Sequence, residues 1–126
     1  MKLRIKGNSI RLRLLQSEVK RLSAAGTISE DVIFGTRPDQ VLRYAIAVSD
    51  GVDVMEVEFS DSQILIMIPE TTALEWFTSD IMSIEREIKI DDETRLSVLI
   101  EKDLVCVERP DDPDNADAYP NPKMSC

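Results

Sequence analysis

The chain contains no histidine, and this absence excludes several kinds of chemistry. Without an imidazole there is no Ser–His or Cys–His nucleophile pair, no His-ligated zinc and no histidine-based pH switch. Cysteine is scarce as well, since Cys106 and Cys126 are the only two. In a chain without an evident secretion signal we expect both thiols to be reduced. No catalytic set of residues stands out, and no cofactor is expected.

Long apolar runs are also missing. No stretch approaches the roughly 20 apolar residues of a membrane helix. The charged start Met1–Lys6 offers no segment that would serve as a signal peptide. We therefore expect a cytoplasmic protein without membrane contact. Its 126 residues, 43% hydrophobic and 31% charged, are typical of one soluble globular domain.

Charge is unevenly distributed along the chain, whose formal net charge is −9. The first 21 residues hold seven basic side chains and one acidic one, whereas the remainder holds eight basic and 23 acidic ones. Nucleic-acid-binding domains are usually basic overall, so no nucleic-acid partner is expected. A basic element on an acidic body fits a protein partner or a homo-oligomer.

What the sequence does contain is an internal repeat. When the sequence is shifted by 54 positions, its apolar residues align with one another. Such a repeat indicates the overall arrangement of strands and helices before any local pattern is considered. The shift aligns Leu3 with Val57, Ile5 with Phe59, Ile10 with Ile64, Leu12 with Ile66, Leu14 with Ile68, Leu22 with Trp76, Leu42 with Leu96 and Ile46 with Ile100. We infer two copies of one strand–strand–helix–strand–strand unit, over about 1–50 and 53–108.

Local patterns agree with this unit. Apolar and polar residues alternate with period two in the expected strands, and turn residues separate them. The predicted strands cover 3–5, 10–14, 28–34, 41–48, 55–59, 64–68, 84–90 and 96–100. One short helix is predicted over 17–25, ended by Gly26, and a second one begins with Pro69 in its first turn. The fold class is therefore α+β: two ββαββ repeats forming about eight antiparallel strands, as a sandwich or a closed barrel, with two short helices.

Residues 1–108 are expected to form a single globular domain, and 109–126 an acidic, proline-rich C-terminal tail. The tail contains Tyr119, an aromatic residue that is unusual in a pure linker. Whether this ring docks on the body or stays mobile is left open by the sequence.

The basic hairpin at the N-terminus is the best candidate for a binding site. Arg4, Lys6 and Arg11 flank the turn at Gly7 and Asn8, whose backbone amides can form an anion-binding concavity. The commoner alternative is a solvated strand face whose charges pair with neighbouring acidic strands. Glu56 and Glu58, on the matching strand of the second copy, are the expected partners in that case.

Two further sets are weaker candidates for metal ligands. Glu85 and Glu87 share one strand face and would ligate Mg²⁺ or Ca²⁺ only if they converged inside a barrel. Cys106 and Cys126 would form a soft-metal or redox pair only if the chain folded back on itself. For both sets the structural explanation is the more common one, and no metal is expected.

Three segments resemble a small bacterial family of uncharacterised proteins. They are Lys2-Leu3-Arg4-Ile5-Lys6-Gly7-Asn8-Ser9-Ile10-Arg11, Glu101-Lys102-Asp103-Leu104-Val105-Cys106 and Asp114-Asn115-Ala116-Asp117-Ala118-Tyr119-Pro120. The resemblance implies that the hairpin, the Glu-Lys-Asp stretch and the tail belong to one design, and it implies no catalytic residues. At Leu15 the chain departs from the hydroxyl expected to cap the first helix. A fold-level resemblance to the triphosphate tunnel enzymes, which are closed eight-stranded barrels, is more distant because their opening alternating-glutamate motif is missing.

These observations predict a non-enzymatic module that binds a protein partner or itself. The alternative is a metal-dependent enzyme that handles phosphate or other anions, using interior carboxylates together with Arg4, Lys6 and Arg11. The two hypotheses differ in where the charged side chains point, since only the enzyme requires them to converge on an enclosed cavity.

Overall fold

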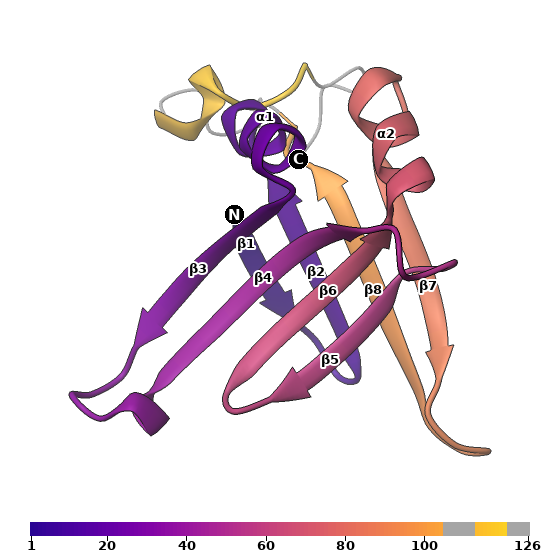
Figure 1. Cartoon of the computed structure of the whole chain (residues 1–126). Helices are drawn as coiled ribbons and strands as arrows, with labels where there is room; N and C mark the ends of the chain where they lie inside the picture. The colour runs from indigo at the N-terminus through magenta and orange to yellow at the C-terminus, as the bar shows by residue number, and fades with distance from the viewer. Residues whose placement is uncertain (105–112, 121–126) are drawn as a thin grey trace. The chain divides into compact units, whose positions relative to one another are not determined.

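The computed structural model of the chain describes residues 1–104 and 113–120 (Figure 1). The chain divides into two compact units, Met1–Lys20 with Met82–Cys126 and, between these segments, Arg21–Ile81. Each unit contains one four-stranded sheet. The eight strands form two separate open sheets and no closed barrel within the described residues. The expected α+β fold of eight strands and two helices is confirmed, and of its two alternatives the barrel is not formed.

The first sheet belongs to the first unit and has the strand order β1-β2-β8-β7. Its outer pairs, β1 with β2 and β7 with β8, are antiparallel hairpins, whereas the central pair of β2 with β8 is parallel. The strands are β1 (Lys2–Ile5), β2 (Ser9–Leu14), β7 (Ser83–Lys89) and β8 (Arg95–Lys102).

The second sheet belongs to the second unit and has the order β3-β4-β6-β5. It again joins two antiparallel hairpins through a parallel central pair, here β4 with β6. The elements are β3 (Thr27–Ile33), β4 (Val41–Ser49), β5 (Glu56–Ser60), β6 (Gln63–Pro69), helix α2 (Glu70–Thr78) and a short 3₁₀ turn at Pro38–Gln40. Helix α1 (Gln16–Ala25) runs across the boundary between the two units.

The internal repeat is confirmed element by element. A shift of 54 carries the first residues of β1, β2, α1 and β4 onto the first residues of β5, β6, α2 and β8. Each repeat contributes one hairpin to each sheet, and the two copies meet along the parallel central strands. The sequence analysis expected antiparallel strands, and the two parallel central pairs depart from that expectation, because turns reveal hairpins but not which hairpins join.

The same repeat relates the most deeply buried residues. Leu12 of β2 lies opposite Ile100 of β8, and their repeat equivalents Ile66 of β6 and Ile46 of β4 lie opposite each other in the second sheet. All four side chains are 0% exposed. Burial of the core-facing side chains decreases toward the hairpin tips, where Ile5 and its equivalent Phe59 are 60% and 70% exposed. Both repeats therefore bury corresponding positions and expose corresponding tips.

The helices begin and end close to where the sequence predicts. Gly26, at a φ of +78°, ends α1, and its amide donates a 2.8 Å hydrogen bond to the carbonyl of Leu22. Pro69 is the N-cap of α2 and so lies just before the helix, whereas the sequence predicted it within the first turn. Helix α2 packs on β4 and β6 and buries Ala73 and Trp76. None of the helices in the described part has the length and apolarity needed to span a bilayer.

Candidate functional site

The basic side chains of the N-terminal hairpin lie on one face of the first sheet. The register pairs Arg4 with Arg11 and Lys2 with Arg13, while the apolar residues between them occupy the opposite face. On the strands that complete the sheet, Leu99 and Glu101 of β8 and Glu85 of β7 fall in the same rows. We call this the charged face of the first sheet. It carries cations on β1 and β2 and carboxylates on β7 and β8.

A hollow of about 640 Å³ lies along this face. It brings together three of the five predicted anion-binding residues and both predicted metal-binding glutamates. Its lining consists of Arg4, Lys6, Ser9, Ile10, Arg11, Glu85, Arg86, Glu87, Ser97, Val98 and Leu99. Arg4, Lys6, Glu85 and Glu87 are exposed, so the hollow is an open depression and not the enclosed cavity that the enzyme hypothesis requires.

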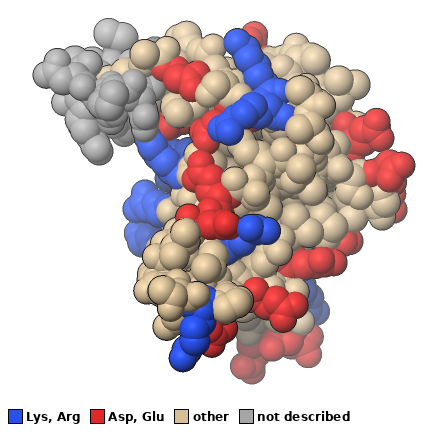
Figure 2. Space-filling view, turned by 60° about the vertical axis from the view of Figure 1, so that its left-hand side comes forward, with Lys and Arg blue, Asp and Glu red and all other residues tan. Residues whose placement is uncertain are grey.

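Opposite charges are interspersed on the face of the protein that Figure 2 shows. In the view of Figure 2, Lys and Arg side chains lie beside Asp and Glu side chains and do not form a continuous basic patch. On the charged face, Glu101 supplies this pairing, because its Oε1 lies 2.9 Å from Nε of Arg11 and 2.5 Å from Nε of Arg13. These arginines are thus partly neutralised before any ligand arrives.

The prediction that Glu56 and Glu58 pair with the basic hairpin is wrong. Glu56 and Glu58 lie on β5, which the repeat places at the edge of the second sheet, where it pairs with β6. The partners of Arg11 and Arg13 come from β8 because β2 pairs with β8 in parallel, and this register sets Arg13 opposite Glu101. Only knowledge of that long-range pairing would have identified Glu101.

The turn between β1 and β2 is tightly hydrogen bonded. Gly7 adopts a φ of +56°, a conformation that favours glycine, and Lys6 and Ser9 close the turn around it. The Ser9 hydroxyl donates to the Lys6 carbonyl at 2.6 Å, and the Asn8 carboxamide donates to the Arg95 carbonyl at 2.6 Å. Asn8 therefore anchors the turn to β8. Its predicted role in binding an anion stays a prediction.

The predicted metal ligands occupy different settings. Glu87 lies 3.2 Å from Nε of Arg95, and it and Glu85 flank the hollow from β7. Within residues 1–104 and 113–120, no three Asp, Glu, His or Cys side chains gather in a way that could hold a metal ion. Cys106 and Cys126 lie outside the described residues, so the thiol hypothesis stays a prediction.

The question of tail docking is resolved for residues 113–120. Tyr119 forms a parallel bridge with Leu104, and its amide donates to the carbonyl of Asp103 at 2.6 Å. Nζ of Lys102 lies 5.5 Å from the centre of the Tyr119 ring, within range of a cation–π interaction. Burial, and next the nearby charge of Asp117, raise the pKa of Tyr119 above its ordinary value. The ring is docked on the first unit.

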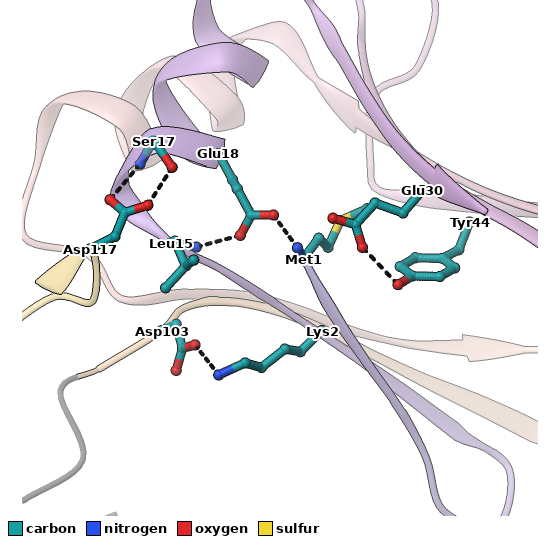
Figure 3. Close-up of polar contacts among 9 residues, drawn as sticks. All are labelled: Met1, Lys2, Leu15, Ser17, Glu18, Glu30, Tyr44, Asp103 and Asp117. Atoms are coloured by element: carbon teal, nitrogen blue, oxygen red, sulfur yellow. Dashed lines mark hydrogen bonds and ion pairs between the residues drawn. The ribbon is translucent and has the colours of Figure 1, made fainter. Parts of the chain in front are cut away.

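Asp117 caps the first turn of helix α1 from the tail (Figure 3). Its carboxylate accepts the amide of Ser17 at 3.0 Å and also the Ser17 hydroxyl, and its carbonyl accepts the amide of Gln16 at 2.9 Å. A helix start leaves such amides without partners inside the helix. The cap that Leu15 cannot provide is therefore supplied by a residue far along the chain.

A second set of contacts secures the same helix start. Glu18 is 4% exposed; its carboxylate accepts the amide of Leu15 at 2.8 Å and pairs with the terminal ammonium of Met1. Lys2, the residue after Met1, places its Nζ 2.9 Å from the carboxylate of Asp103, which is 6% exposed. Figure 3 shows these contacts together with those of Asp117.

Of the three segments that carried the family resemblance, the Glu-Lys-Asp stretch thus contacts both of the others. Within the Glu-Lys-Asp stretch, Glu101 pairs with the hairpin arginines, Lys102 lies over Tyr119, and Asp103 binds both Lys2 and the tail amide. Alternate residues of a strand point to opposite sides, so one short stretch can serve two surfaces. The Glu-Lys-Asp motif therefore has a structural role, since it connects the hairpin to the tail.

The fold and the site define a small α+β domain of two ββαββ repeats, with exchanged hairpins and an open charged hollow on one sheet. The chain belongs to the family described as "Family of unknown function (DUF7009)", whose model matches residues 1–123. Searches of the curated proteins and of the solved structures gave no match. The predicted membership in a small family without assigned activity is confirmed.

Proposed function

We propose that this chain is a non-catalytic module that associates with a second copy of itself through one face of the second sheet. This surface, which we call the apolar face, consists of Val41, Ala45, Ala47, Leu65 and Met67. The register places Ala45 opposite Leu65 and Ala47 opposite Met67, so these four side chains form a contiguous stripe on the central strands.

The repeat supplies the observation that carries this proposal. The equivalents of Leu65 and Met67 in the first sheet are Arg11 and Arg13, and those of Ala45 and Ala47 are Leu99 and Glu101. The first sheet therefore presents an ion-paired surface at positions where the second presents apolar groups. Since both copies have the same architecture, this difference does not follow from folding requirements. In the stripe, Ala47, Leu65 and Met67 are half-buried and Ala45 is buried, and contiguous apolar side chains that stay partly exposed favour a contact with protein.

The charges around the apolar face permit a second copy as the partner. A chain with a net charge of −9 repels its own copies over most of its surface. Beside the stripe, however, Arg43 is neutralised by a two-pronged contact with Asp31 at 2.7 and 3.0 Å. A twofold axis parallel to the strands sets β5 of one copy against β3 of the other, so Glu56 and Glu58 do not meet their own equivalents.

Sedimentation equilibrium tests this proposal. We expect the wild-type chain to sediment as a dimer and Leu65→Lys, which places a charge in the centre of the stripe, as a folded monomer. Leu74→Lys is the matched control, because Leu74 is a 60% exposed leucine on α2 of the same unit. It should stay dimeric.

A monomeric wild-type chain would overturn self-association, as would a Leu65→Lys variant that remains dimeric. Circular dichroism of each variant shows whether it is folded. If Leu65→Lys does not fold, the milder Leu65→Ser replaces it, and a folded Leu65→Ser variant that associates as tightly as wild type contradicts the proposal.

A further inference from the structure

The hollow on the charged face has the size of a small-molecule site. Its volume of about 640 Å³ falls within the range of roughly 300–1,000 Å³ that is typical of ligand pockets. All of its lining residues belong to the first unit. The hollow shares no residue with the apolar face, so a ligand bound there goes beyond the proposed function and does not depend on it.

One row across the sheet sets the geometry of this hollow. In the register, Arg4 of β1 lies beside Arg11 of β2, Arg11 beside Leu99 of β8, and Leu99 beside Glu85 of β7. The row thus runs from two cations over an aliphatic side chain to a carboxylate. Strands are spaced by about 4.8 Å, so the backbones of Arg11 and Glu85 are roughly 10 Å apart.

The neighbouring row shows what is different here. There the register sets Arg13 directly opposite Glu101, and the two side chains form an ion pair. In the row of Arg4, Leu99 occupies the position on β8 where a carboxylate would close the pair. Cation and carboxylate are therefore held apart by an apolar spacer.

Among the residues that the structure describes, the side chains at the two ends of this row have no protein partner. Arg4, Lys6 and Glu85 form no ion pair or side-chain hydrogen bond within the described residues, although each lines the hollow. Gly7 and Asn8 do not line the hollow themselves, but they lie in the turn between Lys6 and Ser9, which do. Within the described residues their amides donate no hydrogen bond, which leaves two further donors next to the basic end. Arg11 is different, because Glu101 already binds it.

We propose that the hollow binds a small dipolar ligand, with an anionic group at one end, an ammonium group at the other and an aliphatic segment between them. The anionic group contacts Arg4, Lys6 and the turn at Gly7. The ammonium group lies against Glu85, and the aliphatic segment covers Leu99. Each charged end of the ligand thus pairs with side chains that have no ion-pair partner among the described residues.

A simple anion is a poorer fit, because Glu85 and Glu87 border the same hollow. A simple cation meets the same difficulty at the other end, where Arg4 and Lys6 lie. A ligand that carries both charges at the separation of the two walls turns each repulsion into an attraction, which gives selectivity as well as affinity.

Titration followed by amide chemical shifts tests this inference with three probes at constant ionic strength. The probes are 8-aminooctanoate, octanoate and octylamine, which carry both charges, the anion alone and the cation alone. We expect 8-aminooctanoate to shift the amides of Arg11, Ser97 and Leu99 and to bind at least roughly fivefold more tightly than either single-charge probe, since each exposed ion pair is weak.

Two variants assign the ends of the ligand. Arg4→Gln should weaken the binding of octanoate and 8-aminooctanoate but not that of octylamine. Glu85→Gln should weaken the binding of octylamine and 8-aminooctanoate but not that of octanoate. Lys20→Gln is the matched control, because Lys20 is exposed on α1 and does not line the hollow. It should bind all three probes as wild type does.

The inference is overturned if 8-aminooctanoate binds no more tightly than the single-charge probes. It is also overturned if neither end variant changes its affinity, or if Lys20→Gln weakens it as much as Arg4→Gln does. The oligomeric state of the chain does not enter any of these outcomes.

Discussion

Ser17 donates both its backbone amide and its hydroxyl to the carboxylate of Asp117, a residue 100 positions later in the chain. A helix that begins without a capping side chain of its own is completed by the tail. The stability of the first unit therefore depends on a segment whose composition is that of a linker.

Replacing Asp117 with Ala should lower the free energy of unfolding by roughly 1 kcal/mol, because the amide of Ser17 loses its acceptor. Urea denaturation measures the effect. Asp117→Asn is the control, since Asn caps helices about as well as Asp. Equal stability of Asp117→Ala and wild type would contradict the capping role.

Two buried residues should be costly to truncate. Leu12→Ala and Ile66→Ala each remove a 0% exposed side chain at equivalent positions of the two repeats, so we expect each to destabilise by roughly 2–5 kcal/mol. The controls are Ile5→Ala and Phe59→Ala at the equivalent exposed tips, where we expect changes within about 0.5 kcal/mol. Denaturant midpoints that fail to separate the buried pair from the exposed pair would disprove the assigned facing.

The turn between β5 and β6 offers a stabilising substitution. Asp61 and Ser62 both have positive φ values, 50° and 61°, a conformation that costs a residue with a Cβ about 1–2 kcal/mol. Ser62→Gly removes this cost and should raise the melting temperature in calorimetry. Ser60→Gly, within β5, should lower it, because glycine weakens a strand. A destabilised Ser62→Gly variant would show that the serine side chain is needed there.

Docking of the tail should weaken in alkaline solution. Burial raises the pKa of Tyr119, so the neutral phenol is favoured when the ring is docked. Its contribution to stability is complete below the ordinary tyrosine pKa of 10.0 and is lost as the pH rises through the higher pKa of the docked ring.

The amide signal of Ser17 reports this undocking, because Asp117 leaves the helix together with Tyr119. We expect the signal to shift above about pH 10 in the wild-type chain. Tyr119→Phe, which cannot ionise, should keep the docked signal at the same pH. An identical alkaline shift in both proteins would assign the transition to another group.

Much of the fold could be predicted from the sequence because its information is local. Alternation around Gly7 indicates the first hairpin, Gly26 ends α1, and the alignment of Leu12 with Ile66 reveals the repeat. The parallel pairing of β2 with β8 could not be predicted, because no turn connects these strands. The repeat alone is compatible with several ways of joining its hairpins.

The candidate site follows the same division. Arg4, Lys6, Arg11, Glu85 and Glu87 were each identifiable as exposed charges on strands, and the structure brings all five to one hollow. Glu101 was missed because its importance depends on the register between distant strands. Asp117 was missed for a related reason, because the sequence showed only that Leu15 lacks the hydroxyl expected to cap the helix and gave no sign of which distant residue replaces it.

The exchange of hairpins between the sheets has a consequence for the separate halves. A fragment ending near residue 50 would hold β1–β2 and β3–β4, each with an unpaired inner strand, and isolated two-stranded hairpins are barely stable in water. Two such fragments would satisfy each other's inner edges in the way the two repeats do here. The chain with both repeats is in this sense a tethered pair of mutually dependent protomers, in which one linker replaces the concentration dependence of assembly.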